Sequence, residues 1–136
     1  MHWDDKGAWT GEVSPLMVKD CGATLVELGH SERRDYFGET DELVAEKIKT
    51  ATDSKLKVIY CCGESLEVRE TGTHFELVKQ QITTALEGFQ PNIIKDVVIA
   101  YEPVWAIGTG LTASPEQAQE MHAFIRETIA GIFGAE

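Results

Sequence analysis

The sequence is poor in positive charge. Its 136 residues include 12 lysines and arginines against 23 aspartates and glutamates, which gives a formal net charge of -11. A nucleic-acid partner needs a basic surface, so this composition argues against one. A small anionic ligand stays open, because a local site can oppose the overall field of the protein.

Long apolar runs and cysteines are also scarce. No stretch reaches the roughly 18 apolar residues of a membrane-spanning helix, and residues 1–5 lack the apolar core of a signal peptide, so we expect no membrane partner. Cys21, Cys61 and Cys62 form an odd set with two adjacent members, which suits neither a disulfide framework nor a zinc motif. The sequence therefore predicts no metal site and favours a reducing cytoplasm.

What the sequence does contain is an alternation of apolar runs and helical patterns. Apolar runs at 23–29, 57–63 and 96–102 do not alternate cleanly with polar residues, which is typical of strands covered on both faces of a parallel sheet. No Pro/Ser-rich linker or low-complexity segment divides the chain. We therefore predict a single α/β domain over residues 1–136, with about three strand–helix units and a leading helix.

Capping signals predict where the helices begin. Ser14 and Pro15 begin the short leading helix, and Thr40 is placed to cap a helix from residue 41. Capping boxes at 73–76 and 114–117 predict two more helices. The expected apolar stripes are Val44, Ile48 and Ala51 in the first of these three helices, Phe75, Val78, Ile82 and Leu86 in the second, and Ala118, Met121, Ile125, Ile129 and Ile132 in the third.

Functional groups of a parallel α/β fold gather where strands end and loops begin, which here selects residues 29–34, 61–64 and 102–110. His30 would open a short helical turn, whose N-terminus favours a neutral, donating imidazole, although a structural histidine fits the position equally well. Glu102 suits a general base at a strand end, and equally a carboxylate paired with a cation.

Three further features of these loops have structural explanations. Cys61 and Cys62 are expected to be small buried residues rather than nucleophiles, because no histidine is adjacent in sequence. Glu64 with Arg33 and Arg34 is expected to form a solvated ion-pair cluster. The segment 103–110 predicts a lid with one stiff and one flexible end, whose glycines could bring backbone N–H groups to a phosphate. An ordinary glycine-containing loop is the alternative.

Five segments carry a resemblance to a known family. They are AYEPVWAIGTG at 100–110, ELGHSERR at 27–34, GAWTGE at 7–12, VIYCCGE at 58–64 and TASPEQA at 112–118. Together and in this order they resemble triosephosphate isomerase. The resemblance implies a (β/α)8 TIM barrel that forms a homodimer in the cytoplasm. It also implies an enzyme of glycolysis and gluconeogenesis that interconverts dihydroxyacetone phosphate and D-glyceraldehyde 3-phosphate without metal or organic cofactor.

Roles for single residues follow from the same resemblance. In the roles known for that family, Glu102 matches the base that moves a proton between two carbons, and His30 matches the neutral electrophile that polarises the carbonyl. Gly108 matches a phosphate-binding N–H, Ser31 the group that holds the withdrawn base, and Cys61 a structural cysteine beside the site. The other matching lid and support residues are Glu64, Pro103, Val104, Trp105, Ala106, Ile107, Thr109 and Gly110, with Glu64 and Trp105 restraining the open lid. Thr10 and Gly11 match the dimer loop.

The sequence departs from the family in what it does not include. The family begins with a strand that carries an asparagine and a phosphate-binding lysine, whereas the only asparagine here is Asn92 and no such strand is present. The glycine-rich loops after the family's last two strands also have no counterpart. We therefore expect a partial (β/α)8 barrel matching strands four to six of eight, inactive alone and prone to associate. A non-catalytic phosphate-binding α/β module and an assembly fragment that needs complementation are the alternatives.

Overall fold

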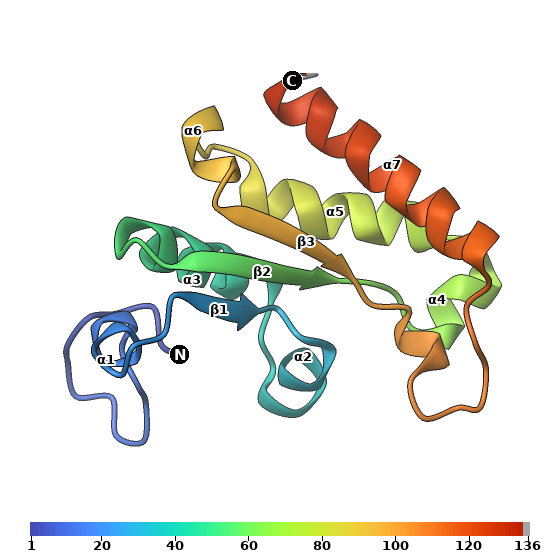
Figure 1. The fold of residues 1–136 in the computed structure, drawn as a ribbon. Coiled ribbons are helices and arrows are strands. Elements are labelled where there is room, and N and C mark those ends of the chain that lie inside the picture. The colour runs from blue at the N-terminus through green and yellow to red at the C-terminus, as the bar shows by residue number, and fades with distance from the viewer. Residues whose placement is uncertain (135–136) are drawn as a thin grey trace.

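The computed structural model describes residues 1–134 and is built on a parallel three-stranded sheet (Figure 1). The strands are β1 (Leu25–Leu28), β2 (Lys57–Cys62) and β3 (Val97–Tyr101), in the spatial order β1-β2-β3. Both pairings are parallel, with Leu28 opposite Tyr60 and Cys62 opposite Tyr101. The carboxyl ends of all three strands therefore lie along one edge of the sheet.

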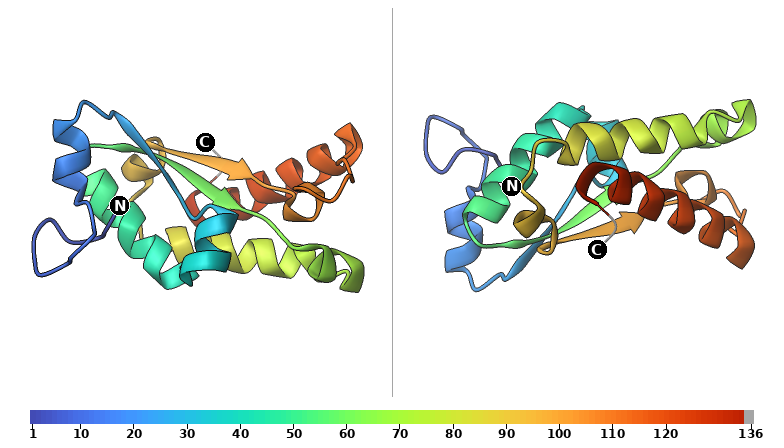
Figure 2. Two further views of the ribbon diagram at one scale, coloured as in Figure 1. Left: turned by 90° about the horizontal axis from the view of Figure 1, so that it is seen from below. Right: turned by 90° about the horizontal axis from the view of Figure 1, so that it is seen from above.

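Helices connect the strands and cover one face of the sheet. Figures 1 and 2 show α3 and α5 along this face, with α7 beside α5. The three predicted strand–helix units and the leading helix are present, with additional short helices at the loops. The helical elements are α1 (Pro15–Asp20), α2 (Ser31–Phe37), α3 (Asp41–Asp53), α4 (Leu66–Thr71), α5 (His74–Leu86), α6 (Pro91–Ile94), the 3-10 helix η1 (Val104–Ala106) and α7 (Pro115–Phe133).

Side-chain caps fix most of the predicted helix starts. Thr40 accepts a hydrogen bond from the backbone of α3, and Ser14 does the same for α1. Ser114 and Gln117 form the reciprocal capping box predicted for α7. The box predicted at Thr73 is wrong, because Thr73 has φ -98° and ψ 15° and makes no side-chain cap hydrogen bond. A capping hydroxyl reaches the first-turn N–H groups from an extended backbone, which Thr73 does not adopt.

The core lies between the sheet and the helix layer. Val58, Tyr60 and Cys62 of β2 are buried against the helices, whose predicted apolar stripes supply most of the remaining core residues. The prediction that both faces of the strands are covered is wrong for the described residues. Ile59 and Val98 are paired on the opposite face, where Val98 is 60% exposed. Within residues 1–134, β1 and β3 also each have one edge without a neighbouring strand.

Candidate active site

Three loops meet at the carboxyl edge of the sheet. His30 lies two residues after β1, Glu64 lies two residues after β2, and Glu102 directly follows β3. The hydrogen bond from the Glu102 N–H to the carbonyl oxygen of Cys62, at 2.8 Å, continues the pairing of β3 with β2 by one residue. The backbone of Glu102 is thereby fixed by the sheet itself.

His30 and Glu102 are in direct contact. The Nε2 atom of His30 lies 3.0 Å from Oε1 of Glu102, and the two side chains are 33% and 17% exposed. His30 is also the N-cap of α2, where its Nδ1 accepts a hydrogen bond from the backbone N–H of Glu32 at 3.2 Å. Because Nδ1 is an acceptor, the ring hydrogen belongs on Nε2, which is the neutral tautomer and places the N–H on the side of Glu102.

The second carboxylate oxygen of Glu102 is bound by α2. The backbone N–H of Ser31, a buried residue, donates to Oε2 of Glu102 at 3.2 Å. Glu102 therefore has a neighbour at each carboxylate oxygen: Oε2 accepts a hydrogen bond from the first turn of α2, and Oε1 lies beside the imidazole of His30. This arrangement holds a carboxylate and a neutral imidazole side by side at a largely buried position.

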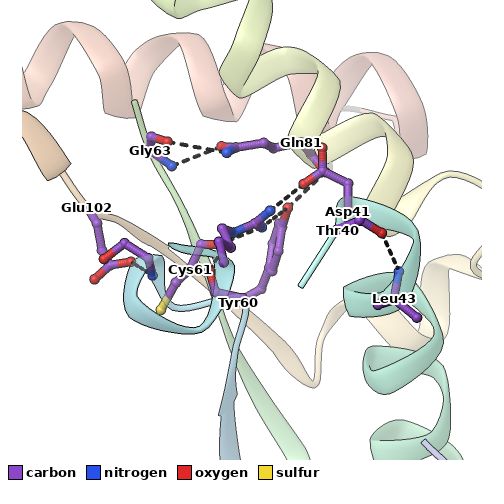
Figure 3. A network of polar contacts seen from close by, with 11 residues as sticks. Thr40, Asp41, Leu43, Tyr60, Cys61, Gly63, Gln81 and Glu102 are labelled. Carbon is purple, nitrogen blue, oxygen red and sulfur yellow. Dashed lines mark hydrogen bonds and ion pairs between the residues drawn. The ribbon is translucent and has the colours of Figure 1, made fainter. Parts of the chain in front are cut away.

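Gly63 lies directly against Glu102 on the neighbouring strand. A Cβ atom built on Gly63 would lie only 1.7 Å from the carbonyl oxygen of Glu102, so no other residue fits without movement of the backbone. The side chain of Gln81, from α5, contacts both backbone groups of Gly63: its Oε1 accepts from the N–H at 2.9 Å and its Nε2 donates to the carbonyl at 3.3 Å. Figure 3 shows this pair of hydrogen bonds.

The sequence analysis missed Gln81. The available signal was its place on the apolar face of α5, three residues after Val78 and next to Ile82. A polar side chain on such a face needs a partner, because burial removes its contacts with water. The structure shows that partner to be the backbone of Gly63.

Arg34 ties α2 to the same network. Its Nε donates to the carbonyl of Gly29 at 2.7 Å, its Nη1 pairs with Asp41, and its Nη2 lies 3.4 Å from the hydroxyl of Tyr60. The Tyr60 hydroxyl donates in turn to the backbone carbonyl of Gln81 at 2.8 Å, as Figure 3 shows. Burial raises the pKa of Tyr60 well above its usual value, so the phenol keeps its hydrogen.

Arg33 belongs to a different cluster. Its Nε donates to Oε1 of Glu39 at 2.7 Å, and the ammonium group of Lys47 pairs with the same oxygen. Burial raises the pKa of Glu39, but hydrogen bonds from Lys47 and Arg33 outweigh it and hold the pKa below its ordinary value. The expected solvated cluster of Glu64 with both arginines is therefore wrong, since each arginine pairs with a different acid.

Glu64 is the most deeply placed of the loop carboxylates, with 0% exposure. Its Oε1 accepts three hydrogen bonds: from Nη1 of Arg69 at 3.0 Å, from the hydroxyl of Tyr101 at 2.9 Å and from Nε1 of Trp105 at 3.0 Å. The guanidinium of Arg69 also lies 5.3 Å from the centre of the Trp105 ring. The buried carboxylate thus anchors the start of the segment after Glu102.

The lid segment, residues 103–110, is held at one end and exposed at the other. Trp105 is 7% exposed within η1, and its carbonyl accepts a hydrogen bond from Oγ1 of Thr109 at 2.8 Å. Ile107 is 55% exposed, and Gly108 and Gly110 have φ of +70° and +79°, a region that favours glycine. The segment therefore has a buried half and an exposed half, and its role as a lid with one stiff and one flexible end stays a prediction.

A hollow of about 190 Å³ lies beside Glu102 and is lined in part by Ser31, Arg34, Gly63 and Gln81. A larger one, of about 340 Å³, lies away from these loops between α3 and the segment after α5. Within the described part of the chain, no group of three or more His, Cys, Asp and Glu side chains is placed to hold a metal ion.

Comparison with known proteins identifies the family. A family model described as triosephosphate isomerase matches residues 1–136. The chain belongs to the triosephosphate isomerase family. The triosephosphate isomerase of Citrifermentans bemidjiense is 55% identical over 134 residues, which are 98% of this chain and 53% of that protein. That of Chlorobium luteolum is 56% identical over 99% of this chain and 53% of its own length. That of Thermoanaerobacter pseudethanolicus is 53% identical over 100% of this chain and 55% of its own length.

The chain thus spans about half the length of the curated triosephosphate isomerases that it matches. The resemblance inferred from the five sequence segments is confirmed, and the parallel sheet with its helices is consistent with part of the α/β barrel of that family. Within residues 1–134, no helix has the length and apolar character needed to cross a membrane.

Two other sets of residues matched to triosephosphate isomerases can be located. Cys61 and Cys62 are buried, as expected, and burial raises the pKa of the Cys62 thiol to about 12. The Sγ of Cys61 donates to Oε1 of Glu27 at 3.4 Å. Thr10 and Gly11 are exposed in the loop that precedes α1.

Proposed function

We propose that this chain supplies the proton-transfer pair of a triosephosphate isomerase, which interconverts dihydroxyacetone phosphate and D-glyceraldehyde 3-phosphate through an enediolate. The observation that carries the proposal is the 3.0 Å contact between His30 Nε2 and Glu102 Oε1, at the carboxyl edge of the sheet in a member of this family. The proposed pair combines a carboxylate base with a neutral N–H donor.

Each group has one step in the proposed reaction. The Glu102 carboxylate takes a proton from the carbon beside the substrate carbonyl and returns it to the neighbouring carbon. His30 donates its Nε2 hydrogen to the substrate carbonyl oxygen, on which negative charge develops, and takes up the hydrogen of the neighbouring hydroxyl, so that one proton moves between the two oxygens as another moves between the two carbons. Ser31 N–H, bound to the other oxygen of Glu102, keeps the base withdrawn until the substrate arrives.

Substrate phosphate would be met by the lid segment. The exposed N–H of Gly108 is the proposed phosphate donor, and the fixed half of the lid, anchored by Trp105 on Glu64, limits how the segment moves. A single hydrogen bond to a charged group contributes about 1.5–3 kcal/mol, which is too little to close a lid and position a dianion. The 136-residue chain alone is therefore proposed to be inactive.

Activity is proposed for an assembly in which further barrel segments cover the open sheet. Within residues 1–134, β1 and β3 each have an unpaired edge, which supports this because unpaired strand edges template association. The exposed loop with Thr10 and Gly11 is the proposed contact of a homodimer, and the three free thiols support a reducing cytoplasm. Retention of both His30 and Glu102 favours this over a non-catalytic phosphate-binding module.

A chimera tests the proposal. This chain would replace the matching segment of the Citrifermentans bemidjiense triosephosphate isomerase, and turnover would be followed by a coupled assay. The chimera should isomerise triose phosphates, and Glu102→Gln should lower kcat by about 10²–10⁴-fold, because no basic carboxylate remains. Glu120→Gln, at an exposed position of α7, is the matched control and should leave kcat unchanged. Normal turnover of Glu102→Gln, or an inactive chimera beside an active relative, would refute the proposal.

A further inference from the structure

Gln81 is a buried polar residue whose side-chain amide forms both of its hydrogen bonds with one residue, Gly63. It lies on the sheet-facing side of α5 and is 6% exposed. Its amide oxygen and nitrogen are both used by the backbone N–H and C=O of Gly63, at 2.9 and 3.3 Å. Figure 3 shows the side chain directed at Gly63, and both residues line the hollow beside Glu102.

The position of Gly63 determines the position of Glu102. The residue has no Cβ, and one built there would lie 1.7 Å from the Glu102 carbonyl oxygen, so the two backbones are in van der Waals contact. Glu102 N–H also donates to the carbonyl of Cys62, one residue before Gly63. A displacement of Gly63 toward β3 would therefore push on the backbone that carries the proposed base.

The backbone of Gln81 is itself held in place by Tyr60 of β2. Its backbone carbonyl accepts the hydroxyl hydrogen of Tyr60 at 2.8 Å, and Tyr60 lies opposite Leu28 in the sheet. The Tyr60 hydroxyl also lies 3.4 Å from Nη2 of Arg34, which belongs to α2. Gln81 is thus fixed to β2 by its main chain and holds the end of β2 by its side chain.

We propose that Gln81 is a positioning residue for Glu102, acting through Gly63, an inference that rests on the proposed isomerase function. Removing the amide would leave both polar groups of Gly63 without their partners, and buried backbone groups are rarely left unpaired. The end of β2 would then relax, and the carboxylate of Glu102 would lose its setting against His30 and Ser31. A displacement of 1 Å at a reacting group can lower the rate by about 10²-fold.

The test compares two methionine variants in the chimera. Gln81→Met keeps the shape of the side chain and removes both hydrogen bonds, whereas Gln80→Met makes the same change at the exposed neighbouring position. Gln81→Met should lower kcat by about tenfold or more and leave KM within about twofold of the parent value. The kcat is expressed per folded enzyme molecule, with the folded fraction measured by circular dichroism. Gln80→Met should stay within about twofold in both constants. A Gln81→Met variant with parental kcat would overturn the proposal.

A third variant, Gln81→Glu, tests the role of the two hydrogen bonds through the pH dependence of kcat. A protonated glutamate offers one acceptor and one O–H donor, as the amide does, whereas an ionised glutamate offers acceptors only. The kcat of Gln81→Glu relative to the parent should therefore rise as the pH falls. A pH-independent ratio would overturn the proposal.

Hydrogen exchange separates failure of this inference from failure of the proposed function. If the parent chimera and Gln80→Met are both inactive, the proposed function fails, and exchange decides the role of Gln81. Gln81→Met should accelerate exchange at the amides of Gly63 and of Ser31, because the Ser31 N–H is donated to Glu102. Faster exchange at Gly63 alone would show that Gln81 holds the loop without setting Glu102, and would overturn the proposal.

Discussion

Replacing Gly63 with alanine tests how closely β2 approaches Glu102. The added Cβ would lie 1.7 Å from the Glu102 carbonyl oxygen, whereas ordinary contacts begin at 3.4 Å, so the two atoms must separate by about 1.7 Å. Gly63 is not among the residues with positive φ, so the cost is steric rather than conformational. The obstructing atom belongs to the backbone, which cannot rotate away as a flexible side chain would.

Both stability and rate should respond to the Gly63→Ala substitution. Overpacking of this kind costs about 1–3 kcal/mol in the free energy of unfolding. Since a 1 Å misplacement already lowers a rate by about 10²-fold, a separation of this size at the base should lower kcat in the chimera by at least about that factor. Urea unfolding followed by circular dichroism and a coupled isomerase assay measure the two effects.

Gly131→Ala is the matched control, because Gly131 lies inside α7 and an added Cβ there meets nothing within 4 Å. That variant should gain about 0.5–1 kcal/mol in stability, as alanine replaces glycine in a helix, and should keep the parental kcat. A Gly63→Ala variant with parental stability and kcat would refute the close approach of the two strands. Equal losses in both variants would show a general sensitivity to the substitution rather than a local one.

Four further outcomes are expected. Glu102→Asp should lower kcat of the chimera by about 10²-fold in the coupled assay, because the shorter side chain withdraws the carboxylate by about 1 Å, and unchanged kcat would contradict this. A thiol reagent at neutral pH should modify exposed Cys21 well before Cys62, whose pKa is raised by burial to about 12; mass spectrometry of the peptides would reveal the reverse order. The pKa of Glu39 lies below its ordinary value of 4.5, so its stabilising contribution is present above that pH and lost as the pH falls through the folded-state value. Glu39→Gln should therefore flatten the acid decline of the free energy of unfolding in urea titrations, and an equally steep decline would count against the cluster. The purified 136-residue chain should sediment as associated species because of its open strand edges, and a monomer with a cooperative melt would exclude that.

The elements that the sequence predicts well are those set by local chemistry. The runs that form β1, β2 and β3 are short and mostly apolar, and the capping box at Ser114 has both of its hydrogen-bonding partners within four residues. The placement of His30 and Glu102 at one edge follows from the parallel topology, because each comes just after a strand.

What the sequence does not reveal depends on contacts made across the fold. Whether Thr73 caps α5 depends on its backbone dihedrals, which the residue letters do not determine. The burial of Glu64 requires donors from Arg69, Tyr101 and Trp105, which converge only after β2 and β3 have paired. Gln81 could be found only by asking what partner a polar residue inside an apolar stripe would have.

Four residues that contact Glu102 come earlier in the chain, which determines the order in which the parts of the site are synthesised. Glu102 is hydrogen-bonded to Ser31 and Cys62 and lies against His30 and Gly63, and all four residues precede it in sequence. A ribosome synthesises the chain from its N-terminus at about 5–20 residues per second, so these groups leave the exit tunnel seconds before the carboxylate does. In vectorial synthesis the neighbours of the base are therefore available before the base itself, and the lid segment and α7 emerge afterwards.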